Sequence, residues 1–255
     1  MSDAAAATSE DAFLGGRLLL CQPRSGHRAG HDAMLLAAAT AARPGDRVAD
    51  LGAGVGAAGL ALARRVEGIA LCLVEIDPDV AALAHRNAAA NAIPADVAVL
   101  DVTAGATAFA AAGLGPDSVD VVLTNPPFND GARHRASPDR ARAAAHMAGP
   151  ATLEAWVHAA RRILRPGGLL TMIWRAEDVA EVLAALSRGF GSLLVQPVHA
   201  GPAKPALRIL VAAVKGGRAP TQILNGLTLN DASGLPDKNV AAVLAGRGVL
   251  ALAER

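Results

Sequence analysis

Between residues 47 and 174 the chain alternates short apolar runs with longer stretches of helical pattern. A strand, a helix and a further strand pack as a right-handed βαβ unit, so a series of such units builds a parallel sheet with helices on both faces. Five strands are expected here, at residues 47–51, 69–75, 96–101, 118–124 and 169–174. Two further apolar runs, 192–198 and 207–214, are joined without a helix and must pair antiparallel or lie apart. The sequence therefore predicts an α/β fold, with a doubly wound, mostly parallel sheet of seven strands and an antiparallel last pair.

The pattern also divides the chain into three parts. Residues 1–16 resemble a flexible tail, because the start of the chain is rich in alanine and acidic residues. Residues 17–215 form the main domain, which begins with a hairpin and a helix that Asp32 is expected to cap. The turn Gly216-Gly-Arg-Ala-Pro220 marks a boundary, and residues 216–255 are expected to form a small C-terminal extension.

Composition argues against several classes of protein. Cys21 and Cys72 lie in apolar runs, which indicates reduced core thiols and a reducing, cytoplasmic compartment. The first residues lack the basic start and apolar core of a signal peptide, and no apolar run reaches the roughly 18 residues that a membrane span needs. No His/Asp cluster indicates a metal site. The net charge is +1, so a polyanion would have to bind a local patch.

A glycine-rich turn, Asp50-Leu-Gly-Ala-Gly-Val-Gly56, follows the first predicted strand. Such a turn lets the backbone approach a ligand closely at the start of the next helix. It also satisfies the dinucleotide pattern G-x-G-x-x-G/A through Gly52, Gly54 and Ala57, with Glu75 placed to bind ribose hydroxyls. The glycines alone leave NAD and other adenosine ligands open.

Acidic residues at the ends of the strands favour a ligand other than a dinucleotide. Asp50 precedes the glycines, where a carboxylate would repel a pyrophosphate but attract an amino group. Glu75 ends the second predicted strand and Asp101 the third. This line of acids suits a ligand that carries an amino acid, a ribose and an adenine. Taken singly, Glu75 and Asp101 could be solvated strand ends.

The fourth strand ends in Asn125-Pro-Pro-Phe128, beside the point where the strand order is expected to reverse and ligands collect. Two adjacent prolines supply no backbone N–H and stiffen the chain, so their carbonyls point in a fixed direction. The pattern predicts a rigid hydrogen-bond acceptor site. The alternative is a rigid turn in which Phe128 faces the core.

These residues resemble class I S-adenosylmethionine-dependent methyltransferases, which have a Rossmann-like fold, over roughly residues 17–215. The Asn-Pro-Pro-Phe ending is similar to that of the branch that methylates planar nitrogens in adenine, guanine or glutamine. Three further segments resemble the bacterial family that methylates N6 of adenine 37 in tRNA-valine: residues 25–37 with Gly30-His-Asp32, residues 136–140 and residues 207–210. His31 stands where that family usually has threonine.

The resemblance implies S-adenosylmethionine as the cofactor. The glycine loop would pass under its methionine part, Glu75 would accept from the ribose, and Asp101 from the adenine amino group. Asp50 and Asp32 would help to hold the amino acid end. The cofactor-binding residues are then Asp32, Asp50, Gly52, Ala53, Gly54, Gly56, Glu75, Ile76, Asp101, Val102 and Asn125.

The resemblance also implies that Asn125, Pro126, Pro127 and Phe128 are catalytic. The Asn125 side-chain oxygen and the Pro126 carbonyl would accept two hydrogen bonds from the target NH2 group, and Phe128 would stack on the flat target. Catalysis would then depend on positioning rather than on acid–base chemistry.

A basic stretch follows the motif, in which four arginines between residues 133 and 142 accompany one acid, Asp139. Such a loop would contact phosphates, with Arg133 and Arg135 as the expected substrate-binding residues, although an ordinary solvated loop explains the charges equally well. His27, Arg28 and His31 could join this face. The expected partner is tRNA or another RNA.

Other functions stay open at this point. A protein glutamine, a guanine of ribosomal RNA or a small-molecule hydroxyl group could be the methyl acceptor. An NAD-binding oxidoreductase is disfavoured by Asp50 and leaves Asn125-Pro-Pro-Phe128 without a purpose. A non-catalytic RNA-binding module predicts that no cofactor binds.

Overall fold

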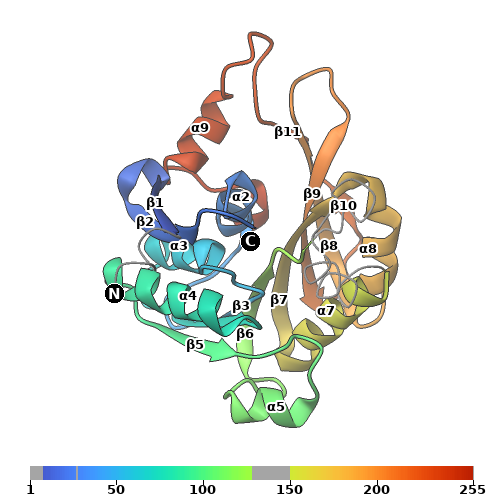
Figure 1. Cartoon of the computed structure of the whole chain (residues 1–255). Coiled ribbons are helices and arrows are strands. Elements are labelled where there is room, and N and C mark those ends of the chain that lie inside the picture. Colours follow the sequence, from blue (N-terminus) through green and yellow to red (C-terminus); the bar gives the residue numbers. More distant parts are fainter. Residues whose placement is uncertain (1–7, 27, 128–149, 255) are drawn as a thin grey trace, which may run out of the picture.

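The computed structural model describes residues 8–26, 28–127 and 150–254 and confirms the doubly wound α/β architecture (Figure 1). Within these residues the main sheet has nine strands, in the order β10-β8-β9-β7-β6-β3-β4-β5, with β11 also paired to β8. Neighbours from β5 to β7 are parallel, and β9 is antiparallel to β7 and β8. The strands are β3 (Arg47–Leu51), β4 (Ala70–Glu75), β5 (Ala95–Val99), β6 (Val119–Thr124), β7 (Leu164–Arg175), β8 (Phe190–His199), β9 (Ala206–Lys215), β10 (Gln222–Ile223) and β11 (Leu227–Thr228).

All seven predicted strands are present, and the last two of them pair antiparallel. The predicted number of strands was nevertheless wrong, because β10 and β11 also join the sheet. Each has only two residues, which is too short to give an alternating apolar pattern.

Helices cover both faces of the sheet and bury a separate apolar cluster on each. Along β3 the side chains alternate, so Val48 packs in one cluster and Ala49 in the other. The first face carries α2 (His31–Ala39), α3 (Ala57–Arg65) and α4 (Pro78–Ala90), and the second carries α5 (Ala106–Ala111), α7 (Pro150–Ile163) and α8 (Val179–Leu186). The helices on the first face begin at the carboxyl edge of the sheet, because each follows a parallel strand or leads into one.

An N-terminal hairpin pairs β1 (Thr8–Phe13) with β2 (Leu18–Pro23). The prediction of a tail through residue 16 is therefore wrong from residue 8 onward. The sequence of β1 is mostly polar and has no apolar pattern, so this strand was missed. It forms through its pairing with β2. Asn87 of α4 and Asn91, which caps the end of this helix, bind the backbone of β2: Asn91 accepts from the Leu19 N–H at 2.9 Å, and Asn87 accepts from the Cys21 N–H at 2.8 Å.

The C-terminal segment extends the sheet at β8 and then returns to the first face. After β11 it forms α9 (Lys238–Leu244), which Asp237 caps by accepting from the Asn239 N–H at 2.8 Å. Beyond α9, the Leu250 N–H donates to the Ala38 carbonyl of α2 at 3.0 Å. Both described cysteines are free thiols. None of the helices in the described ranges combines the length and apolar composition of a membrane-crossing segment.

Candidate active site

The ends of three parallel strands bring the main predicted residues together. The register pairs Leu51 of β3 with both Val74 of β4 and Thr124 of β6. The residues that follow directly are Gly52, Glu75 and Asn125, so these lie side by side at the carboxyl edge of the sheet. The Thr124 hydroxyl donates to the Leu51 carbonyl at 2.9 Å and fixes the two central strand ends to each other.

The glycines of the loop after β3 have different roles. Gly52, Gly54 and Gly56 all have positive φ, at 69°, 56° and 87°. A Cβ at Gly52 would lie 2.8 Å from Cζ3 of Trp156 and nearer still to its Cη2, so this glycine allows close packing against α7. A Cβ at Gly54 would meet no atom within 4 Å. Gly54 therefore faces open space, which is where a ligand could approach the backbone.

Glu75 joins the two loops at this edge. Its Oε2 accepts from the Gly54 N–H at 2.9 Å, and its Oε1 accepts from the N–H groups of Ile76 and Asp77 at 2.9 and 3.0 Å. Carboxylate oxygens have further lone pairs, so this fixed group can still accept from ribose hydroxyls. The Ile76 side chain is 47% exposed beside it and offers an apolar surface to a flat ring.

Asp50 is buried beneath the loop rather than exposed on it. Its side chain is 2% exposed and accepts from the Gly59 N–H in the first turns of α3 at 2.8 Å. Burial raises the pKa of Asp50 to about 7. The hydrogen bond from Gly59 lowers the pKa but does not cancel this effect, and the negative charge of Glu75 raises it further. Asp50 thus supports the loop from the core side, and the predicted contact with the amino acid end of a cofactor stays a prediction.

Asp101 lies two residues beyond the end of β5, close to Glu75. The Leu100 N–H donates to the Glu75 carbonyl at 2.9 Å and draws this loop to the site. One Asp101 oxygen, Oδ1, accepts from the Thr103 N–H and hydroxyl at 2.7 and 2.8 Å. The neighbouring Val102 is buried in the apolar cluster on the second face. The carboxylate itself is exposed, as an adenine-binding acceptor would need to be.

Asp32 reaches the same edge from α2, but it does not cap the helix. Gly30 occupies the cap position without a side-chain hydrogen bond, so the predicted cap is wrong, and Asp32 lies in the first turn instead. Its Oδ2 accepts from Nε of Arg208 at 3.0 Å. In β9, Arg208 pairs with Arg175, beyond the level of Thr124 in β6, so this ion pair lies above the carboxyl edge of the sheet.

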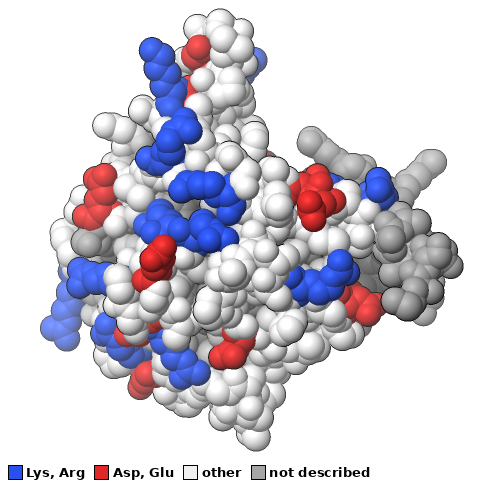
Figure 2. Space-filling view, turned by 90° about the vertical axis from the view of Figure 1, so that its left-hand side faces the viewer, with Lys and Arg blue, Asp and Glu red and all other residues white. Residues whose placement is uncertain are grey.

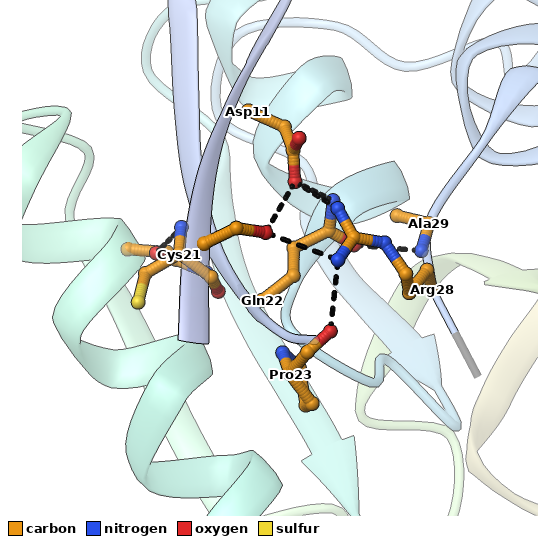
Figure 3. Close-up of polar contacts among 8 residues, drawn as sticks. Asp11, Cys21, Gln22, Pro23, Arg28 and Ala29 are labelled. Atoms are coloured by element: carbon orange, nitrogen blue, oxygen red, sulfur yellow. Dashed lines mark hydrogen bonds and ion pairs between the residues drawn. The ribbon is translucent and has the colours of Figure 1, made fainter. Parts of the chain in front are cut away.

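The loop before α2 is held by a polar network on the hairpin (Figure 3). Gln22 is 1% exposed; its Oε1 accepts from the Ala29 N–H at 2.7 Å and its Nε2 donates to Asp11 at 2.9 Å. The Arg28 guanidinium also binds Asp11 and donates to the Pro23 carbonyl at 3.0 Å. Arg28 therefore anchors this loop, its contact with a substrate stays a prediction, and His27 lies outside the described residues.

Asn125 presents the clearest chemical signal. Its Oδ1 is buried, and no donor among the described residues binds it. Leaving a buried acceptor without a donor costs about 1–3 kcal/mol, and a ligand that supplied the donor would remove this cost. Pro126 is buried next to it and Pro127 is partly buried. Phe128, Arg133 and Arg135 lie outside the described residues.

These features fit S-adenosylmethionine and an NH2-bearing target. Open space at Gly54, a fixed carboxylate at Glu75 and an exposed one at Asp101 match the methionine, ribose and adenine parts of the cofactor. No group of three or more His, Cys, Asp or Glu side chains in the described part of the chain is arranged to bind a metal. Sequence reasoning missed Trp156, whose contact with Gly52 connects segments far apart in the chain.

Fold and site together define a class I methyltransferase that uses S-adenosylmethionine. The chain belongs to the methyltransferase small domain family, whose model matches residues 27–198. The crystal structure of a predicted O-methyltransferase, protein Atu636 from Agrobacterium tumefaciens, is 34% identical, has a TM-score of 0.72 and covers 86% of this chain and 98% of its own.

Two relatives are similar in sequence but differ in substrate. The tRNA1(Val) (adenine(37)-N6)-methyltransferase of Tolumonas auensis is 28% identical over 169 residues, which cover 66% of this chain and 68% of the relative. The release factor glutamine methyltransferase of Bifidobacterium longum is 33% identical over 135 residues, or 49% of this chain and 46% of the relative. By their names, the first acts on N6 of an adenine in tRNA and the second on a glutamine of a release factor.

Proposed function

We propose that this methyltransferase methylates the N6 amino group of an adenine in tRNA, in the cytoplasm. The observation that carries the proposal is the buried, unpaired Oδ1 of Asn125 at the end of β6. An exocyclic NH2 group has two N–H donors, and Oδ1 together with the Pro126 carbonyl offers two acceptors in a rigid segment. The similarity to adenine N6-methyltransferases supports the choice of adenine.

The protein's contribution is to hold the amino group in place. S-adenosylmethionine, when bound, supplies an electrophilic methyl group. The acceptors at Asn125 and Pro126 orient the nitrogen and favour the positive charge that grows on it during transfer. Holding the nucleophile in line contributes up to about 7–11 kcal/mol of barrier reduction, so no strong base is needed. Glu75 keeps the glycine loop in a fixed shape, through the hydrogen bond to Gly54.

A protein glutamine is the second candidate substrate. Its side-chain amide is also a planar NH2 group, and the similarity to a release factor glutamine methyltransferase favours it specifically. The two substrates differ beyond the acceptor site, because one is attached to phosphates and the other to a peptide.

Two variants separate binding from transfer. Asn125→Ala should reduce turnover by about 100-fold or more while the dissociation constant for S-adenosylmethionine changes little, because the amide oxygen is proposed to bind the target, and the other predicted cofactor-binding residues are unchanged. Glu75→Ala should weaken cofactor binding, since it removes the acceptor of three N–H groups at the ribose position. Equal losses of cofactor affinity in both variants, measured by calorimetry, would contradict these roles.

The substrate is tested with unmodified bulk tRNA. The protein and S-adenosylmethionine are incubated with it, and the nucleosides are analysed by mass spectrometry. New N6-methyladenosine supports the proposal. Its absence, with cofactor binding intact and with methylation of a release factor, would favour the glutamine.

A further inference from the structure

Three arginines from distant parts of the sequence line one pocket on the first face of the molecule, and a fourth, Arg247, is exposed between two residues of its lining. Arg17 comes from the hairpin, Arg64 and Arg65 from the last turn of α3, and Arg247 from the segment after α9. Arg17, Arg64 and Arg65 line one shallow pocket together with Gly246 and Gly248, and the exposed Arg247 lies between these two glycines in the chain. Figure 2 shows a group of Lys and Arg side chains on this side of the molecule, with acidic side chains at its border.

Three of these guanidinium groups donate hydrogen bonds to carbonyl groups at the C-terminal ends of three helices. Arg64 donates to the Asn91 carbonyl at 2.6 Å at the end of α4, and Arg65 donates to the Ala37 carbonyl at 3.0 Å at the end of α2. Arg17 donates to the Ala245 carbonyl at 3.2 Å at the end of α9. The groups are therefore held in place before any ligand arrives, which reduces the entropy lost on binding.

The helix ends do not neutralise this surface. A helix C-terminus carries only about half a negative charge, and it is screened. None of the four arginines forms an ion pair with any Asp or Glu that the structure describes, whereas other described arginines do, such as Arg28 with Asp11. The Nε atoms of Arg64 and Arg65 are buried and bind no acceptor in the same described ranges. With a net charge of +1 for the whole chain, the surface is a local concentration of positive charge.

The surface lies at the opposite end of α3 from the glycine loop. Helix α3 begins at the glycine loop and ends at Arg65, and its nine residues span about 14 Å at about 1.5 Å per residue. One strand of nucleic acid covers that distance in about four nucleotides, at roughly 3.4 Å each. One guanidinium group can donate two parallel hydrogen bonds to the oxygens of one phosphate, so arginine suits such a contact better than lysine.

We propose that Arg17, Arg64, Arg65 and Arg247 form a phosphate-binding surface. It binds the RNA backbone at nucleotides other than the one that is methylated. The inference rests on the proposed RNA substrate and names the surface that the substrate would use in addition to the acceptor site. It predicts that tRNA binds more tightly than a trinucleotide containing the same adenine, which is too short to reach from the acceptor to the arginines.

The test uses Arg247→Glu in the full chain, because this side chain is exposed and does not fix a helix end. The KM for tRNA should rise about threefold or more, and the slope of log KM against log salt should fall by about one. The ratio of the trinucleotide KM to the tRNA KM should shrink. The matched control is Arg218→Glu, the same change at an exposed arginine in the loop between β9 and β10, which should behave like the wild type.

The outcomes separate this inference from the proposed function. If the wild type methylates tRNA but Arg247→Glu matches Arg218→Glu in KM and salt slope, the surface is refuted and the RNA substrate stands. If the wild type methylates no RNA, both the phosphate-binding surface and the proposed RNA substrate are refuted. If a release factor is the substrate and Arg247→Glu raises its KM, the surface binds an acidic protein and the RNA inference is wrong.

Discussion

Replacing Asp50 by asparagine should make the stability of the protein less dependent on pH. Asp50 is buried, and burial raises its pKa from 3.8 to about 7. Between these two values the folded state holds a proton that the unfolded state has released. Stability therefore falls as the pH rises through this window, because folding then forces an ionised carboxyl group to take up a proton or to be buried with its charge.

The magnitude follows from the width of the window. A shift of about three pKa units corresponds to about 4 kcal/mol of stability lost between pH 4 and pH 8, at about 1.36 kcal/mol per unit. Asparagine has nearly the same shape and does not ionise, and its oxygen can still accept from the Gly59 N–H. Its added NH2 group needs a partner, but that cost does not change with pH. The difference in unfolding free energy between Asp50→Asn and the wild type should move in favour of the variant by up to about 4 kcal/mol from pH 4 to pH 8.

The assay is urea unfolding of both proteins at a series of pH values between 4 and 8. Asp120→Asn is the control. Burial would raise the pKa of Asp120, but hydrogen bonds from the Arg47 N–H and the Arg165 side chain outweigh it and lower the pKa. That carboxyl group contributes stability above the unfolded pKa of 3.8 and loses it only as the pH falls through the lowered value, so the effect of Asp120→Asn should be constant from pH 5 to pH 8. An Asp50→Asn difference that is equally constant over this range would refute the reasoning.

Two further predictions concern the packing and the ion pair at the site. Gly52→Ala should cost about 1–3 kcal/mol more stability than Gly54→Ala in urea unfolding, because both strain a positive φ but only the first meets Trp156. Arg208→Ala should weaken S-adenosylmethionine binding roughly fivefold in calorimetry, since a partly exposed ion pair that orients Asp32 is worth up to about 1 kcal/mol.

Each of these predictions has an outcome that contradicts it. If Gly54→Ala is as destabilising as Gly52→Ala, the contact with Trp156 does not limit the loop. For the ion pair, the control is Lys215→Ala, which removes a bond of 2.7 Å to Asp117 at the other end of β9. An equal loss of cofactor affinity in Lys215→Ala would mean that Arg208 acts through the stability of the strand.

The central fold could be predicted from sequence because strands and helices of ordinary length leave a periodic pattern. The same pattern predicted that the glycine loop, Glu75 and Asn125 lie at the ends of separate strands. The register confirms that these strand ends meet at one edge of the sheet. The family resemblance is confirmed by the matching family model. Each of these conclusions depends on residues that are close in sequence or on a rule of parallel sheets.

The errors concern features that depend on tertiary contacts. Strand β1 and the two-residue strands β10 and β11 exist through their partners, and their own residues carry little pattern. The burial of Asp50 was also not foreseen, because the alternation of a buried strand does not show which face a polar residue takes, and its side chain accepts from the Gly59 N–H of α3. The contact of Trp156 with Gly52 likewise has no local signal.

The contact between Arg17 and the carbonyl groups that follow α9 has a consequence for the order of folding. It joins residues separated by 228 positions, so it can form only when nearly the whole described chain has left the ribosome. Contacts over such long separations are slow to close, because the loop entropy is lost before the contact stabilises anything. The central strands can pair earlier, since β3, β4 and β5 follow one another in sequence. We expect the cofactor-binding edge to assemble first during synthesis, and the basic surface to be completed last.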